Sequence, residues 1–229
     1  MKEQKTIAVT GSSRGIGRAV VQNCAQAGHK VIAVTRNSGC FDNAAANIVP
    51  VYIDVTNENG RRQLIRQLDQ NNIVLDGILH NAGLLVKKPF YKMTETDLMR
   101  MYKVNCITPF MVTRDLIDAG RIRVKSSITA ISSIGGVEDS IKFPELSGYG
   151  ASKSALNALI QHLAVELKEY HINAIAPGAV ETEMQKQAFP NFKPALNAED
   201  FAQFVTYFIT EGFNFFNGQI LKVKLDDPK

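Results

Sequence analysis

The chain has 229 residues, of which 45% are hydrophobic and 21% charged, and this composition is that of an ordinary globular protein rather than a disordered one. Its net charge of +4 is small and diffuse, with no run of Lys and Arg, so no nucleic-acid partner is expected. No apolar stretch approaches the roughly 20 residues that span a bilayer, and the first residues lead directly into an apolar run, so we expect neither a membrane partner nor a signal peptide.

Apolar runs of strand length recur along the chain, and several are continuously apolar and β-branched. Such runs are typical of strands buried on both faces of a parallel sheet. The predicted strands are Thr6–Thr10, Lys30–Thr35, Ile48–Ile53, Leu75–His80, Val124–Ser132, Ile172–Ala176 and Gln219–Val223.

Stretches of helical period lie between these runs, at Ile16–Ala27, Arg61–Leu68 and Tyr149–Lys168. The last carries a broad apolar stripe from Ala155 to Leu167. Strands alternating with helices predict an α/β fold with a doubly wound, mostly parallel sheet of seven strands and helices on both faces. Because no linker or internal repeat interrupts the pattern, we predict a single domain over residues 1–229.

The sequence Thr-Gly-Ser-Ser-Arg-Gly-Ile-Gly at residues 10–17 joins the first strand to the first helix. Gly11, Gly15 and Gly17 allow a sharp turn, a close approach of the backbone to a pyrophosphate and tight packing of the helix on the sheet. The helix N-terminus offers N–H groups and partial positive charge to the phosphates. The turn therefore predicts a dinucleotide site, although a glycine-rich turn alone can also be only a tight connection.

Tyr149 and Lys153 stand four residues apart at the start of the long predicted helix. Positions i and i+4 share a helix face, so the two side chains should point the same way. The ammonium should lower the pKa of the phenol and tune it as an acid or base. Ser133 follows a strand, and at that edge of the sheet a serine can hydrogen-bond a substrate oxygen.

These motifs in this order resemble the short-chain dehydrogenase/reductase family, and the resemblance covers nearly the whole chain. It implies a Rossmann fold and a catalytic set of Asn105, Ser133, Tyr149 and Lys153. Tyr149 would exchange a proton with the substrate oxygen, Lys153 would also hold the nicotinamide ribose, and Asn105 would anchor a relay water. The cofactor-binding residues implied are Gly11, Ser13, Arg14, Gly15, Ile16, Gly17, Thr35, Arg36, Asp54, Val55, Asn81, Ala82, Gly83, Tyr149, Lys153, Pro177, Gly178, Val180 and Thr182.

The end of the second strand favours NADP(H), with NAD(H) possible. It reads Val34-Thr35-Arg36-Asn37, without the carboxylate that would bind a ribose 2′-hydroxyl and repel a 2′-phosphate. Thr35 offers a hydroxyl, and Arg36 and Arg14 offer cations. Three cysteines and four histidines show no ligand spacing, so we expect no metal and reduced thiols in a cytoplasmic protein.

The segment after Thr182 is shorter than the family's usual substrate cover, and we expect a short lid at about 183–200. Met184, Ala188, Phe189 and Phe192 there either line an apolar pocket or pack the lid on its own domain. The tail Lys222–Lys229 lacks the family's usual Asp-Gly-Gly, which puts a tetramer in doubt, whereas a homodimer through the helices carrying Asn105 and Tyr149 is expected.

The predicted function is hydride transfer between NADP(H) and a carbonyl or secondary alcohol group of a small-molecule substrate, with Tyr149 as general acid and base. The alternative is a sensor or signalling relative that binds NADP(H) with little turnover, and the short lid is its main support. A sugar-nucleotide epimerase or dehydratase would need a larger region after Pro177 than the roughly 50 residues present. Ketone, aldehyde, 3-oxoacyl thioester, steroid and quinone substrates all stay open.

Overall fold

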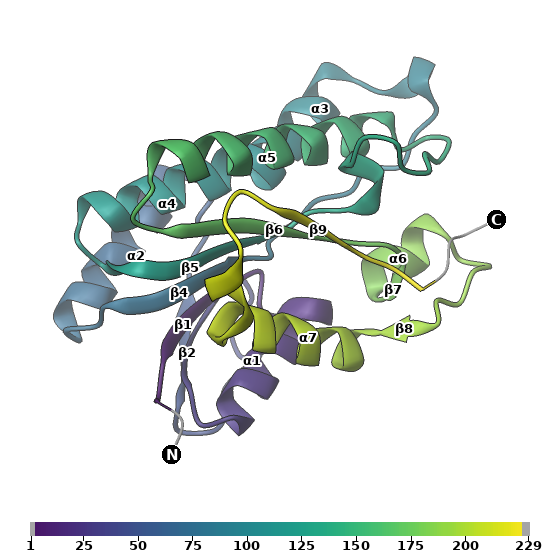
Figure 1. Ribbon diagram of the computed structural model, residues 1–229. Coiled ribbons are helices and arrows are strands. Elements are labelled where there is room, and N and C mark those ends of the chain that lie inside the picture. The colour runs from purple at the N-terminus through teal and green to yellow at the C-terminus, as the bar shows by residue number, and fades with distance from the viewer. Residues whose placement is uncertain (1–2, 226–229) are drawn as a thin grey trace.

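The computed structural model describes residues 3–225, so Met1, Lys2 and the last four residues of the predicted tail lie outside the described part of the chain. A seven-stranded sheet in the order β3-β2-β1-β4-β5-β6-β9 runs through the molecule, and all six of its pairings are parallel (Figure 1). Its strands are β1 (Thr6–Thr10), β2 (Lys30–Thr35), β3 (Ile48–Tyr52), β4 (Leu75–His80), β5 (Ile122–Ile131), β6 (His171–Pro177) and β9 (Ile220–Val223).

Seven α-helices and four shorter helices connect the strands within this part of the chain. The α-helices are α1 (Gly15–Gln26), α2 (Glu58–Gln70), α3 (Glu95–Tyr102), α4 (Thr108–Asp118), α5 (Ser147–Glu166), α6 (Glu183–Ala188) and α7 (Ala198–Thr210). The shorter ones are η1 (Phe90–Lys92), η2 (Lys103–Ile107), η3 (Ile134–Gly136) and η4 (Gly212–Phe215), and a small parallel pair is formed by β7 (Val180–Glu181) and β8 (Leu196–Asn197).

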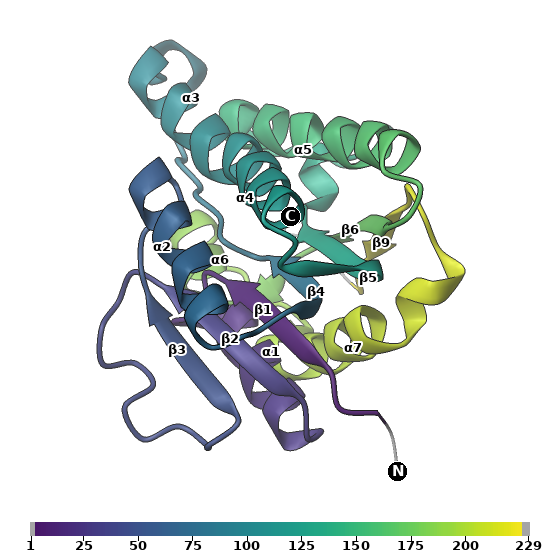
Figure 2. The same cartoon turned by 90° about the vertical axis from the view of Figure 1, so that its left-hand side faces the viewer.

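The helices form two layers, one on each face of the sheet (Figures 1 and 2). Leu64 of α2, Leu116 of α4 and Ile160 of α5 are buried in the core on one face. Val20 of α1 and Phe201 of α7 are buried in the core on the other face. The single doubly wound Rossmann-type α/β domain predicted from the sequence is therefore confirmed, and its central strands are apolar on both faces because both are covered.

The strand order reverses between β1 and β4, and in such sheets ligands bind beyond the carboxyl ends of the strands at this point. Because these strands are parallel, the segments that follow β1, β2, β4, β5 and β6 all emerge at the same edge of the sheet. Loops that are far apart in the sequence therefore meet there.

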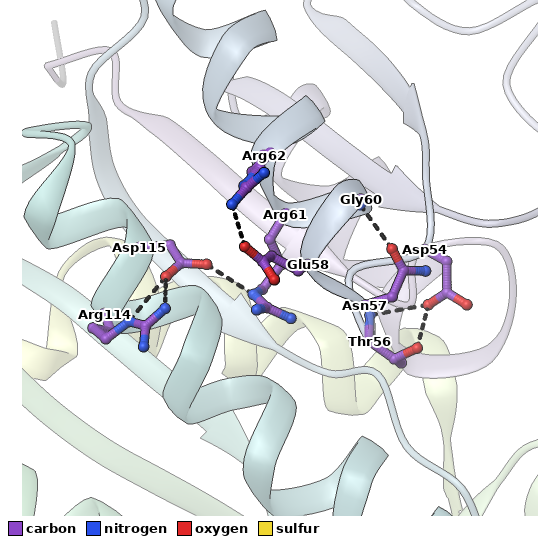
Figure 3. Close-up of polar contacts among 9 residues, drawn as sticks. All are labelled: Asp54, Thr56, Asn57, Glu58, Gly60, Arg61, Arg62, Arg114 and Asp115. Atoms are coloured by element: carbon purple, nitrogen blue, oxygen red, sulfur yellow. Dashed lines mark hydrogen bonds and ion pairs between the residues drawn. The ribbon is translucent and has the colours of Figure 1, made fainter.

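A buried ion pair joins α2 to α4 on one face of the sheet (Figure 3). Nε of Arg61, only 5% exposed, lies 2.7 Å from Oδ2 of Asp115. Arg114 contacts the other oxygen of the same carboxylate at 2.6 Å from the solvent side. Asn57 caps the N-terminus of α2 by accepting a 2.8 Å hydrogen bond from the Gly60 N–H, so this helix is fixed both at its start and along its side.

Within residues 3–225, no helix combines the length and the apolar character that crossing a membrane requires. Across the same residues, no three His, Cys, Asp or Glu side chains gather as metal ligands would. Cys24 is buried, Cys40 and Cys106 are half-buried, and none of the three is in a disulfide.

Candidate active site

A cleft of about 1460 Å³ opens at the carboxyl ends of the strands. Pockets for a single small molecule usually measure about 300–1,000 Å³, so this cleft has room for a dinucleotide and a second molecule. Every residue predicted for the site lines the cleft, apart from Gly17 and Asn105, which are buried behind its wall. The sequence therefore identified residues that the fold brings together.

The glycine turn leaves no room for side chains against the loop after β4. Gly11 has a φ of +65°, and a Cβ there would lie 2.7 Å from the Cα of Ala82. A Cβ on Gly17 would lie 2.3 Å from Nδ2 of Asn81, the amide that donates a 2.9 Å hydrogen bond to the Gly11 carbonyl. The turn has no side chains at its glycines, and α1 begins at Gly15 with no acidic residue in its first turn. The turn therefore fits a pyrophosphate at the N-terminus of α1.

The far end of the cleft carries the groups predicted for the adenine ribose. Arg36 has a side chain that is 73% exposed, and its Nη1 lies 3.9 Å from Oδ2 of Asp54. This exposed, long ion pair is weak, so the guanidinium can turn towards a phosphate. The other oxygen of Asp54 accepts hydrogen bonds from the N–H and hydroxyl of Thr56, at 3.0 and 2.7 Å (Figure 3). Thr35 is buried, and its hydroxyl accepts a 3.1 Å hydrogen bond from the Asn37 N–H.

Tyr149 lies in the first turn of α5, and Lys153 follows one turn later. Lys153 is 3% exposed; its Nζ donates a 2.7 Å hydrogen bond to the Ile131 carbonyl at the end of β5 and lies 5.9 Å from the centre of the Tyr149 ring. Ser133 also follows β5, and its hydroxyl accepts a 3.2 Å hydrogen bond from the Gly135 N–H. A phenol, an ammonium and a hydroxyl thus border the same part of the cleft.

Burial sets the pKa values of these groups in the protein chain alone. It raises the pKa of Tyr149 to about 12, against the opposing effect of a hydrogen bond with Ser133. It lowers the pKa of Lys153 to about 8, against the opposing effect of the nearby Cys106. We expected Lys153 to lower the pKa of Tyr149; in the chain alone the pKa is instead raised, because burial, which disfavours the charged phenolate, is the largest effect on it.

Asn105 is 1% exposed and lies on η2, a π-helical turn between α3 and α4. Its Nδ2 donates to the Leu84 carbonyl at 2.8 Å and to Oγ of Ser152 at 2.9 Å, and its Oδ1 accepts from the Leu84 N–H at 2.8 Å. Both amide hydrogens are therefore used. The side chain ties the loop after β4 to α5, so a relay water would have to bind the remaining Oδ1 lone pair or the main chain.

The substrate end of the cleft contains apolar residues that sequence reasoning did not assign. They come from the loop after β4, which contributes Leu85, and from the loop before α5, which contributes Phe143 and Leu146. Met184 and Phe189, which we expected either to line a pocket or to pack on the domain, do line the cleft. An apolar residue in a loop gives no periodic signal, so only the tertiary structure separates a pocket wall from ordinary packing.

Comparison with known proteins places this geometry in a family. The sequence profile described as short chain dehydrogenase matches residues 5–192. The L-2,3-butanediol dehydrogenase of Corynebacterium glutamicum is 30% identical, over 96% of this chain and 96% of its own. The 3-oxoacyl-[acyl-carrier-protein] reductase MabA of Mycobacterium tuberculosis is 26% identical, over 96% of this chain and 91% of its own.

Solved structures share the fold. A 4-hydroxyisoleucine dehydrogenase complexed with NADH superposes with a TM-score of 0.85 at 24% identity, covering 96% of this chain and 97% of that one. The L-sorbose reductase of Gluconobacter frateurii, complexed with NADPH and L-sorbose, gives 0.85 at 20% identity, covering 97% and 95%. The chain belongs to the short-chain dehydrogenase/reductase family of NAD(P)-dependent oxidoreductases that act on CH–OH and C=O groups.

Proposed function

We propose that the protein reduces a carbonyl compound with NADPH, or oxidises the corresponding secondary alcohol with NADP⁺, and that Tyr149 is its general acid and base. The observation that carries the proposal is the single cleft that joins the bare glycine turn to Ser133, Tyr149 and Lys153. The four residues of the family's catalytic set are all present, which favours an enzyme over a sensor that binds the cofactor without turnover.

The raised pKa of Tyr149 suits the direction of reduction. A phenol with a pKa of about 12 holds its proton at neutral pH, so its Oη can donate that proton to a carbonyl oxygen. The nicotinamide, when bound, supplies the hydride. Ser133 Oγ can donate to the same oxygen and stabilise the negative charge that develops on it. In the opposite direction, Oη must first lose its proton, and the positive charge of Lys153 favours that loss.

Lys153 remains mostly protonated at neutral pH, because its pKa of about 8 is still above 7. Its ammonium has three hydrogens, and the Ile131 carbonyl accepts one of them. Two donors are left for the hydroxyls of a nicotinamide ribose. Thr182 caps α6 by accepting a 3.2 Å hydrogen bond from the Gln185 N–H, so the hydrogen of its hydroxyl can be donated to a nicotinamide carboxamide.

The remaining cofactor residues fall into two groups along the cleft. Ser13, Gly15 and Ile16 belong to the phosphate-binding turn. Pro177 ends β6, and Gly178 and Val180 follow it near the nicotinamide end. NADP(H) is favoured over NAD(H) by Arg36 and Arg14, which line the ribose end, and by the absence of an acidic residue at the end of β2.

We also propose a cytoplasmic homodimer. The exposed surface of α4 and α5 and the segment before α4 includes Phe110, Ile107 and Val165, whose side chains are 39, 38 and 68% exposed and suit a partner of the same kind. The three free thiols, which lie apart in the sequence, fit a reducing compartment.

Turnover on a panel of carbonyl compounds tests the proposed activity. NADPH consumption would be followed with small aldehydes, methyl ketones, acyl thioesters and bulky cyclic ketones, and the Kd for NADPH would be measured alongside. Consumption with at least one class is the expected result. A protein that binds NADPH but is silent on every class would contradict the enzyme proposal and favour the sensor.

A further inference from the structure

Three segments that are distant in the sequence close the substrate end of the cleft. They are the loop after β4, the loop before α5 and the lid segment, defined here as residues 183–192. Figure 1 places α6, the helical part of the lid segment, beyond the carboxyl ends of β6 and β9. What holds these segments together decides whether this end of the cleft is open or shut.

Two aromatic rings meet between the loop before α5 and the lid segment. The ring centres of Phe143 and Phe189 are 5.0 Å apart, with an angle of 69° between the ring planes. This edge-to-face arrangement is favourable for aromatic rings. Both residues line the cleft, so the pair forms an apolar wall built from two separate segments.

One ammonium group contacts all the segments that form this wall. Nζ of Lys87, in the loop after β4, donates a 2.7 Å hydrogen bond to the Ala188 carbonyl at the end of α6. It lies 5.3 Å from the centre of the Phe189 ring and 3.7 Å from Oε2 of Glu145. A main-chain contact also joins the loop after β4 to the loop before α5, since the Lys88 N–H donates a 3.0 Å hydrogen bond to the Glu145 carbonyl.

The position of the ammonium suits the end of a helix. The last carbonyls of a helix have no partner within it and carry partial negative charge, so a cation there is stabilising. α6 has only six residues, and the side chain of Gln185 ties it to the Phe189 and Phe192 carbonyls at 3.4 and 2.9 Å. These hydrogen bonds stay within the lid segment and do not join it to the loops around it. Lys87 therefore supplies a contact that the short lid cannot provide from within.

We propose that Lys87 is a positioning residue that fastens the lid segment over the substrate end of the cleft and holds Phe189 against Phe143 as the wall for an apolar substituent of the substrate. The part of this inference that concerns the substrate rests on the proposed function. The contact of Lys87 with the lid segment does not depend on it. The inference assigns the protein to carbonyl compounds with an apolar group beside the reacting carbon.

Hydrogen–deuterium exchange of the full-length protein, with and without NADPH, tests the fastening without any substrate. The amides of Phe189 and Phe192 are hydrogen-bonded within the lid segment, and that of Lys186 is bonded to the Thr182 carbonyl directly before it, so all three report its opening. Lys87→Met, which keeps the alkyl stem, should speed their exchange about tenfold, and Lys87→Arg should restore most of the protection. The control is Lys186→Met. It also replaces a lysine by methionine, but on α6 itself, and it removes only the 3.0 Å ion pair with Glu181.

Kinetics test the wall with two methyl ketones, acetophenone and hydroxyacetone, which differ in having an apolar or a polar substituent. Lys87→Met should raise the KM for acetophenone about tenfold and change its kcat less than twofold, with a smaller effect on hydroxyacetone. Phe189→Ala should lower the preference for acetophenone in kcat/KM by a similar factor.

Unchanged exchange in Lys87→Met, or equal changes in Lys87→Met and Lys186→Met, would overturn the proposal. So would an equal loss on both ketones in Phe189→Ala. If neither ketone is turned over, the proposed activity on such ketones fails, and the exchange experiment still decides the role of Lys87.

Discussion

The proposed preference for NADP(H) over NAD(H) depends most directly on Arg36. Its guanidinium lines the ribose end of the cleft and has only a long, exposed contact with Asp54. Arg36→Asp should raise the Kd for NADPH by about 10- to 100-fold, because a charge-assisted hydrogen bond of about 1.5–3 kcal/mol is replaced by repulsion of the 2′-phosphate. The Kd for NADH should not rise. Titration of both cofactors by calorimetry measures this.

The matched control is Arg66→Asp, which changes the net charge equally but lies on α2 outside the cleft. It should leave both Kd values within about twofold, since Arg66 is exposed, does not line the cleft, and its charge is screened by salt. Equal loss of NADPH and NADH affinity in Arg36→Asp would contradict the assignment of the 2′-phosphate to this arginine.

For Tyr149, the pairing with Lys153 could be predicted from the sequence, but the direction of the pKa shift could not. Its spacing from Lys153 predicted the pair correctly, because i and i+4 positions on a helix share a face whatever surrounds them. The predicted direction of its pKa shift was wrong, because the shift depends on how much water the folded loops leave around the phenol. Burial is a tertiary property, and no local pattern around residue 149 contains it.

At the scale of elements, strands were predicted better than helices. β1, β2 and β4 have the predicted bounds, since each has an apolar, buried stretch that is followed by a polar turn. β5 begins two residues earlier than predicted, and its pairing with β4 shifts register close to Lys125, which has a φ of +61°. α3, α4 and α7 were not among the helices delimited from the sequence, and the predicted lid range of 183–200 overlaps the start of α7, which packs in the core.

The ion pair between α2 and α4 gives a stability prediction for these elements. Asp115→Ala leaves the Arg61 guanidinium buried without its partner, which should lower the free energy of unfolding by about 2–4 kcal/mol. Arg114→Ala removes the exposed contact with the same carboxylate and should cost less than about 1 kcal/mol. Urea denaturation of both variants measures the difference, and equal effects would mean that burial of the pair is unimportant.

At the scale of the whole molecule, the site consists of the ends of strands that are brought to one edge of the sheet. The glycine turn could be predicted because it is a compact motif that directly follows a strand, and Tyr149 and Lys153 because their spacing fits one helix face. Asn105, between α3 and α4, came only from the resemblance to the family. The substrate wall could not be predicted, since Lys87, Phe143 and Phe189 meet only through the tertiary fold. Residues for the cofactor can thus be predicted from the sequence more readily than residues for the substrate.

The buried His80 makes the stability of the whole fold depend on pH. Its Nε2 lies 2.9 Å from Oγ1 of Thr113, and burial lowers its pKa from 6.5 to about 4. Between these values the unfolded chain binds a proton that the folded chain does not, so stability is full above pH 6.5 and falls as the pH drops towards 4. At pH 5 this loss should be about 2 kcal/mol relative to pH 7.5.

Urea denaturation at pH 7.5 and pH 5.0 of the wild type and His80→Asn measures this loss. The asparagine can still hydrogen-bond Thr113 but does not titrate, so its stability should change by about 2 kcal/mol less between the two pH values. The same change in both proteins would show that other groups cause the pH dependence.

The role of Tyr149 is the central claim, and comparison of Tyr149→Phe with the wild type tests it most directly. With a carbonyl compound that the wild type reduces, kcat/KM and the Kd for NADPH would be measured for both proteins. Loss of the proton donor should lower kcat/KM by about 10²–10⁴-fold, the usual contribution of general acid catalysis, and leave the Kd for NADPH within a few-fold. A variant that binds NADPH normally and still reduces the compound at the wild-type rate would contradict the assignment of the proton to Tyr149.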